Sequence, residues 1–160
     1  MKDKVNFLIK FLILTIVLFI IWIPVGEVYL LLLAWVSKYV LWVMGYQVTL
    51  ITEGSPVFIY QGAAVGMEDA HLANFNIIPL VALILATPRI EPMRRVKMLA
   101  IGMFLLFAMH IIDFVSHFPM YFSGSGIAEI VVIFMAVGEV AVPFVLWFVL
   151  AHKAILGNGQ

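Results

Sequence analysis

The sequence predicts an all-α integral membrane protein with four transmembrane helices, an interfacial helix and a small extracytoplasmic β-hairpin. Its 160 residues are 65% hydrophobic and 11% charged, with a mean hydropathy of +1.16. That is more apolar surface than a soluble core of this size can hide. The apolar residues are also gathered in stretches of about 20, the length that crosses a bilayer. We therefore expect a single membrane domain over residues 1–160.

Four apolar stretches are predicted to span the membrane. The first follows a charged start and ends at Pro24. It is longer than the apolar core of a cleavable signal peptide, and no small-residue cleavage site follows it, so we expect it to remain as a helix. The predicted spans cover residues 5–23, 71–87, 98–118 and 127–151.

Basic residues predict the orientation of these spans. Lys and Arg gather on the cytoplasmic side of membrane proteins, and here they lie before and at the start of the first span, separate the second from the third and follow the last. Four spans place all three clusters on one side. We expect a multi-pass protein of the cell (plasma) membrane with both termini in the cytoplasm. The clusters are Lys2, Lys4 and Lys10, then Arg89, Arg94, Arg95 and Lys97, then His152 and Lys153.

Residues 29–46 are predicted to form an interfacial helix. Aromatic residues recur there at i, i+4, i+7 and i+11, a stripe that is typical of the headgroup level. The alternative is a fifth span that buries Lys38 at a cost. A fifth span would also place the basic loop at residues 89–97 outside, against the orientation rule. The aromatic residues are Trp35, Tyr39, Trp42 and Tyr46.

Two runs that favour strands follow this helix and predict a hairpin over residues 48–61. The segment Glu53-Gly54-Ser55-Pro56 lies between them and is a turn sequence. Residues 62–66 contain two glycines, and we expect them to be a flexible approach to the second span. The whole of residues 24–70 is placed on the outer side of the membrane.

Ionisable residues inside spans are rare and costly, so each suggests a functional site. His110, Asp113 and His117 follow one another at i, i+3 and i+7, and they therefore share one helical face toward the outer end of the third span. If the spans pack in the expected order, this face lies near His71 and Glu129, at the starts of the second and fourth spans. These five residues are the candidate metal ligands.

Imidazole and carboxylate groups suit a transition metal, and neutral His also binds a tetrapyrrole. No complete metal-binding motif is present. The alternative is a structural cluster in which Asp113 bonds to a neighbouring His at the wet end of the bundle. Glu139 in the fourth span is a proton or ligand site, or a protonated acid bonded to another helix. Asn74 and Asn76 are expected to link helices.

Four further features are spread along the chain: the aromatic stretch that ends Met44-Gly45-Tyr46, the span that ends Ala86-Thr87-Pro88, the basic loop Arg94-Arg95-Val96-Lys97, and Gly102 eight residues before His110. Together they resemble the archaeosortase/exosortase family of multispan membrane transpeptidases, especially its short members. The resemblance extends over nearly the whole chain and implies the membrane fold predicted above.

The same resemblance implies a Cys, Arg and His triad at the outer face. In this sequence the family's Cys position falls at or beside His71, and its Asn-x-x-Arg falls on His110 to Asp113, so Arg is replaced by Asp. The catalytic His would lie near Ala128 or Glu129. The chain contains no cysteine, so it lacks a thiolate nucleophile, and it also lacks the cation that would stabilise an oxyanion. We expect no transpeptidation by the family's mechanism.

Three hypotheses for function follow. The first is a non-catalytic, exosortase-like protein that acts as a structural or accessory subunit of a larger membrane complex, with other membrane subunits and the lipid bilayer as its partners. The second is a metal- or pigment-binding subunit that uses the outward His/Asp cluster. The third is a surviving transpeptidase or protease in which His71 or Ser116 takes a new role. Nine basic and nine acidic residues give no net charge, so we expect no nucleic-acid partner.

Overall fold

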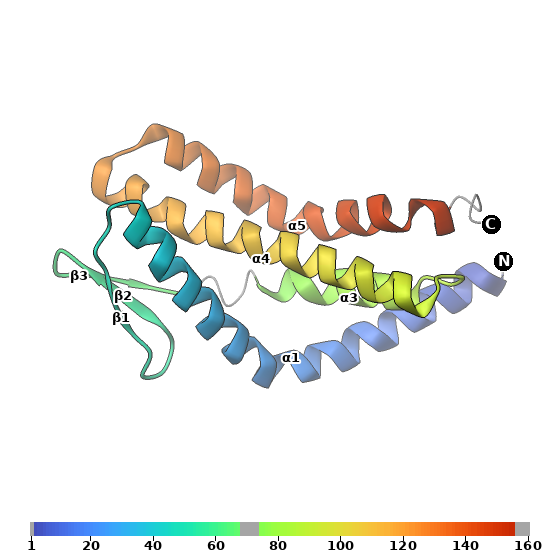
Figure 1. The fold of residues 1–160 in the computed structure, drawn as a ribbon. Helices are drawn as coiled ribbons and strands as arrows, with labels where there is room; N and C mark the ends of the chain where they lie inside the picture. The colour runs from blue at the N-terminus through green and yellow to red at the C-terminus, as the bar shows by residue number, and fades with distance from the viewer. Residues whose placement is uncertain (1, 68–73, 156–160) are drawn as a thin grey trace. The chain divides into compact units, whose positions relative to one another are not determined.

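The computed structural model describes residues 2–67 and 74–155 and is mostly helical, with one small sheet (Figure 1). Within those residues, three helices are long and apolar enough to cross a membrane: α1 (Lys2–Val43), α4 (Pro92–Ser123) and α5 (Gly126–Ile155). The described chain thus has the helical membrane character that its composition predicts.

The chain divides into two compact units. The terminal unit consists of residues 1–23, 75–106 and 139–160, and the sheet unit consists of residues 24–74 and 107–138. All three long helices contribute to both units. Each unit is described by itself below.

Helix α1 continues through Pro24, where the sequence predicts that the first span ends. The structure therefore has one helix of 42 residues in place of the two predicted helices over 5–23 and 29–46. Proline removes one helical hydrogen bond, but the apolar residues on both sides keep every other backbone group paired by staying helical. Pro119 lies inside α4 and Pro143 inside α5 in the same way.

The short helix α3 (Ile77–Ala86) is the buried element of the terminal unit. Seven of its ten residues are buried, and a single 3-10 turn, η1 (Asn74–Asn76), precedes it. The described part of the predicted 71–87 span is therefore this turn and α3, and residues 71–73 lie outside the described residues.

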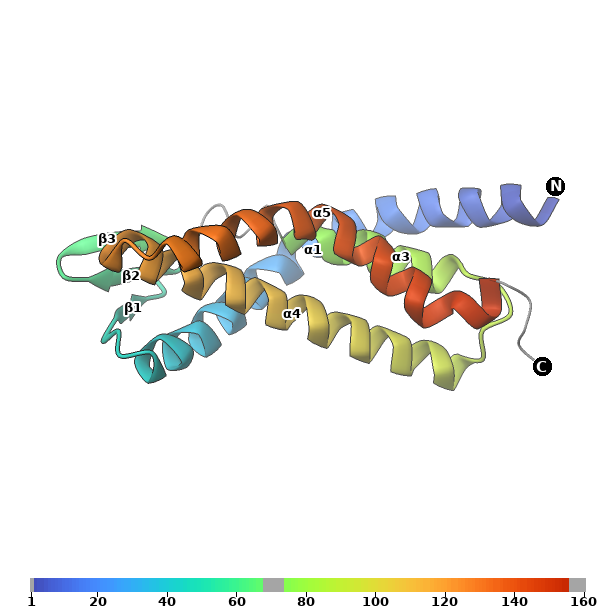
Figure 2. The ribbon, with the colours of Figure 1, turned by 90° about the horizontal axis from the view of Figure 1, so that it is seen from above.

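Ring contacts give the direction of α3 relative to α1. Phe75 stacks on Phe19 with 5.0 Å between ring centroids, whereas the other end of α3 lies with Phe7 around one cavity. Helix α3 therefore runs antiparallel to the first part of α1. The start of α1, the α3–α4 connection and the end of α5 lie at one end of this unit (Figures 1 and 2).

A close approach joins α3 to α4 in the same unit. A Cβ atom added at Gly102 of α4 would lie 2.8 Å from Cδ2 of Leu80, which is fully buried. No side chain fits that gap without displacing Leu80. Small residues of this kind allow the close helix packing that membrane bundles use.

The sheet unit contains three antiparallel strands in the order β1-β2-β3: β1 (Thr49–Ile51), β2 (Val57–Tyr60) and β3 (Ala63–Gly66). Gly54 and Gly62 have φ angles of 85° and 82° in the two turns, a conformation that glycine adopts without strain. The predicted hairpin over 48–61 is present, but the segment predicted to be flexible forms a third strand paired to β2.

The core of the sheet unit combines α1, the sheet and α4. Phe58 of β2 is fully buried, with its ring centroid 4.9 Å from that of Phe114 and 6.0 Å from that of Phe118. Other buried members come from the second half of α1, from the end of the sheet and from α4: Leu30, Leu33, Ala34, Leu41, Met67 and Val115. The sheet is thus fixed to two helices by aromatic and aliphatic contacts.

Candidate functional site

The predicted polar face on α4 is present in the sheet unit, but its residues have different surroundings. His110 is only 3% exposed, whereas Asp113 and His117 are half-buried. Glu129, in the first turn of α5, is exposed. His71 lies outside the described residues.

His110 is held by Tyr29, which comes from α1. The Tyr29 hydroxyl and His110 Nδ1 share a hydrogen bond of 2.7 Å, and the two rings meet edge to face at 5.9 Å between centroids. Phe107 packs on the same tyrosine at 5.6 Å. A buried polar side chain must find such a partner to offset its loss of water. The Tyr29–His110 pair therefore links two helices that are 81 residues apart in sequence.

His117 makes a local contact instead. Its Nδ1–H donates to the backbone carbonyl of Asp113 at 2.9 Å, and its ring lies 5.7 Å from that of Tyr121. One imidazole nitrogen is thus used within the helix. Ser116, the other residue considered for a catalytic role, donates to the Ile112 carbonyl at 2.6 Å.

Glu129 lies at the N-terminal turn of α5. The Ser125 hydroxyl accepts the Ala128 N–H at 3.3 Å, which is the contact of a helix N-cap. A carboxylate one turn inside a helix start interacts favourably with the helix dipole. The position of Glu129 therefore has a structural explanation in its own helix.

Among the described residues, no group of three or more His, Cys, Asp or Glu side chains lies close enough to hold a metal ion. The spacing on α4 places three of the five candidate ligands, His110, Asp113 and His117, on one helical face. The imidazole of His110 is hydrogen-bonded to Tyr29, and that of His117 is hydrogen-bonded to a backbone carbonyl of its own helix. A metal site that includes His71 stays a prediction.

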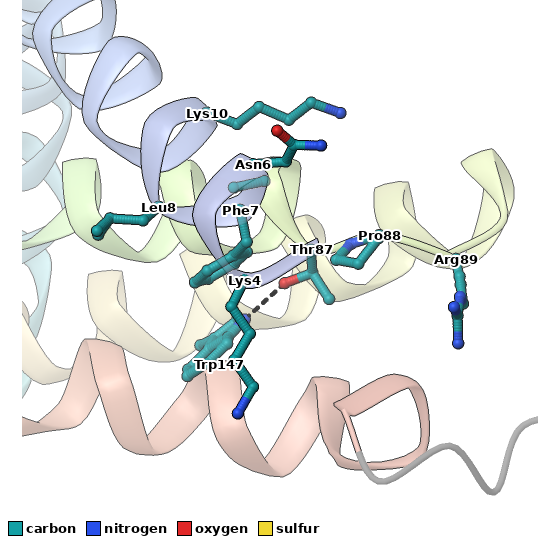
Figure 3. Close-up of a pocket in the computed structure, with 10 residues that line it drawn as sticks. Lys4, Asn6, Phe7, Leu8, Lys10, Thr87, Pro88, Arg89 and Trp147 are labelled. Atoms are coloured by element: carbon teal, nitrogen blue, oxygen red, sulfur yellow. Dashed lines mark hydrogen bonds between the residues drawn. The ribbon is translucent and has the colours of Figure 1, made fainter. Parts of the chain in front are cut away.

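A second polar cluster lies around Thr87 in the terminal unit. The Thr87 hydroxyl donates to the Leu83 carbonyl at 2.6 Å and accepts the indole N–H of Trp147 at 2.8 Å (Figure 3). The Thr87 carbonyl accepts a hydrogen bond from Nη2 of Arg95 at 3.0 Å. One buried threonine thus ties the end of α3 to α4 and to α5.

Sequence reasoning did not assign Tyr29, Thr87 or Trp147 to any polar contact. Tyr29 was only the first residue of the predicted interfacial helix, and nothing in a helical period reveals a partner on another helix. For Thr87, the sequence Ala86-Thr87-Pro88 at the end of an apolar run could have indicated a polar contact. A proline there ends the helix, and the last backbone carbonyls of the helix then need hydrogen-bond donors from elsewhere.

Comparison of the chain with protein-family models, with curated proteins and with solved structures finds no match.

Proposed function

We propose that the chain is a non-catalytic, exosortase-like membrane protein that serves as a structural or accessory subunit of a larger membrane complex. The observation that carries the proposal is the exposure of its long helices. In the most apolar 18-residue windows of α1 and α5, only 6% of the residues are buried within the chain, against 33% for α4. Helices that are apolar all round and make few internal contacts are available to partner helices as well as to lipid.

The contacts of the polar residues support a scaffold role. His110 bonds to Tyr29, His117 to a backbone carbonyl and Ser116 to its own helix. Each of these bonds stabilises packing or a helix, and the Ser116 hydroxyl is bonded to a backbone carbonyl instead of to the general base that would activate a serine nucleophile. The chain also has no cysteine to act as a thiolate.

In the topology that we propose, the chain crosses the membrane four times and the second half of α1 lies at the outer membrane surface. This topology is supported by the antiparallel course of α3 beside α1, which brings Lys4 and Arg89 to one cavity. Exposed Glu27 and half-buried Lys38 lie in the second half of α1, beyond the length that a bilayer core accommodates. The ring of exposed Trp35 lies 5.3 Å from Nζ of Lys38, an arrangement that suits the headgroup level.

Site-specific photocrosslinking in native membranes tests the proposal. A photoreactive phenylalanine analogue is placed singly at Phe134 and Phe148, which are 71% and 51% exposed on α5. We expect a crosslink to a second membrane protein from at least one of these positions, and migration of the extracted chain in native gels as part of an assembly larger than 18.0 kDa plus detergent.

The same analogue at Phe118, which is fully buried in the sheet unit, is the matched control and should give no intermolecular crosslink. Crosslinks to lipid alone from both exposed positions, together with a monodisperse monomer after mild extraction, would contradict the proposal.

A further inference from the structure

A cavity of about 670 Å³ lies within the terminal unit, where the first turns of α1 meet the end of α3 and the side of α5. Figure 3 shows the side chains around it. Its lining combines three cations with aromatic, aliphatic and hydroxyl groups: Lys4, Asn6, Phe7, Leu8, Lys10, Ala86, Thr87, Pro88, Arg89 and Trp147. Cavities of this size are typical of small-molecule sites.

The charge of this cavity is one-sided. Lys4, Lys10 and Arg89 carry positive charge into its lining, and none of the described residues that line it is acidic. All three cations are exposed. The described lining thus carries positive charge only, and the summed potential of its three cations attracts an anion to the cavity.

Arg89 has a backbone conformation that residues other than glycine rarely adopt. Its φ angle is 60°, in the left-handed region that costs any residue with a Cβ atom. Glycine would fit this turn more easily. The chain instead places a guanidinium group here, the side chain best suited to bind a phosphate through two hydrogen bonds.

Part of the cavity wall is apolar. The rings of Phe7 and Trp147 stack at 6.0 Å between centroids, and the indole N–H is already bonded to Thr87, so this wall offers flat apolar surface. Leu8 and Leu12, exposed by 54% and 51%, continue the apolar surface along α1. A ligand that fits both parts is anionic at one end and hydrocarbon at the other.

We propose that this cavity is a binding site for the phosphate headgroup of an anionic phospholipid. Basic pockets between helix ends at the membrane surface recognise such headgroups by charge and hydrogen bonds, and the apolar wall distinguishes a lipid from a free phosphate ion. The site is independent of the proposed accessory role, because it uses residues of this chain alone.

Native mass spectrometry of the delipidated full-length chain in detergent tests the site. The protein is titrated with phosphatidylglycerol, with phosphatidylcholine of the same acyl chains, and with inorganic phosphate. We expect phosphatidylglycerol to bind at least tenfold more tightly than phosphatidylcholine, and millimolar inorganic phosphate not to displace it. Each basic residue near an anionic lipid contributes about fivefold in affinity, so the triple variant Lys4→Gln, Lys10→Gln, Arg89→Gln should lose about a hundredfold.

The control variant Lys38→Gln, Arg94→Gln, Lys97→Gln removes the same charge at positions that do not line the cavity, and it should lose less than threefold. The single variant Lys10→Gln, with an expected loss of about fivefold, serves if the triple variant does not fold. Equal binding of the two lipids, or equal losses in the pocket and control variants, would overturn the site. Displacement of the lipid by inorganic phosphate at the same affinity would show a general anion site and overturn the lipid assignment.

Discussion

Tyr29 and His110 form a side-chain hydrogen bond between α1 and α4 in the sheet unit. His110 has almost no contact with solvent, so without the phenol its ring would lose an interaction that water could not replace. The pair is therefore expected to stabilise the packing of the two helices. Its energy should be modest, because interhelical hydrogen bonds in membrane proteins average about 0.6 kcal/mol and reach about 1.7 kcal/mol.

A double-mutant cycle measures this pair. Tyr29→Phe and His110→Phe should each lower the free energy of unfolding, and the coupling between them should be about 1 kcal/mol. The measurement is reversible unfolding in detergent micelles, with His117→Ala as a comparison, because His117 bonds only within its own helix. Additive single effects would show that the bond contributes nothing to stability.

The same variants separate a structural histidine from a ligand. If His110 and His117 bound a metal or pigment, His110→Ala and His117→Ala would each release it, and the two single variants would resemble the double variant. Metal content and visible absorbance of the protein from native membranes are therefore measured together with its unfolding.

Helices α3 and α4 depend on a glycine at their contact. Gly102→Ala should lower the free energy of unfolding by about 1 kcal/mol and Gly102→Leu by up to about 3 kcal/mol, because each added group presses on buried Leu80. The measurement is again unfolding in detergent. Gly126→Ala is the matched control, since a Cβ atom at Gly126 meets nothing within 4 Å.

A second variant isolates the cause of the Gly102 effect. Leu80→Ala removes the side chain that a Cβ at position 102 would meet, so the loss in the pair Gly102→Ala, Leu80→Ala should be smaller than the sum of the two single losses. A simple sum would mean that the Gly102 effect comes from somewhere other than this contact.

At the scale of the elements, the sequence predicted α4 and α5 well, but it divided α1 in two and expected a full span over 71–87, where the only α-helix among the described residues is the ten-residue α3. Apolar length and basic clusters are strong signals, and α4 and α5 extend the predicted spans by only a few residues at each end. Pro24 was interpreted as a helix end, although a membrane helix tolerates a proline when lipid leaves the backbone no other partner. The strand β3 was missed because Ala63, Ala64 and Gly66 have little preference for strands, and pairing with β2 decides their conformation.

At the scale of the whole chain, the topology can be tested without background because the sequence has no cysteine. Single cysteines at Ser55, in the turn between β1 and β2, and at Ser125, before α5, should react with an impermeant thiol reagent added to intact cells. A cysteine at Glu91, in the basic connection before α4, should react only after the membrane is opened. Labelling of position 91 from outside would contradict the four-crossing topology.

The candidate site was the part that sequence could least predict. Helical spacing placed His110, Asp113 and His117 on one face, and the structure agrees. It could not show that His110 faces a tyrosine from α1, because that contact depends on tertiary packing. Likewise, Lys4, Lys10 and Arg89 were predicted to share a side of the membrane from their charge alone, while the cavity that they line depends on the course of α3.

The length of α1 also affects how the chain fits its bilayer. Residues 2–23 of α1, the part within the terminal unit, extend about 33 Å, close to the thickness of a hydrocarbon core. Exposed aliphatic side chains continue past Pro24 to Val28 and Leu32. The proposed topology places these side chains at the outer surface, where a thicker hydrocarbon core would cover more of them, and each ångström of mismatch between core and helix has a small energetic cost. Membranes of greater thickness should therefore accommodate this chain at lower cost, and bilayer thickness itself becomes a factor in where the protein accumulates.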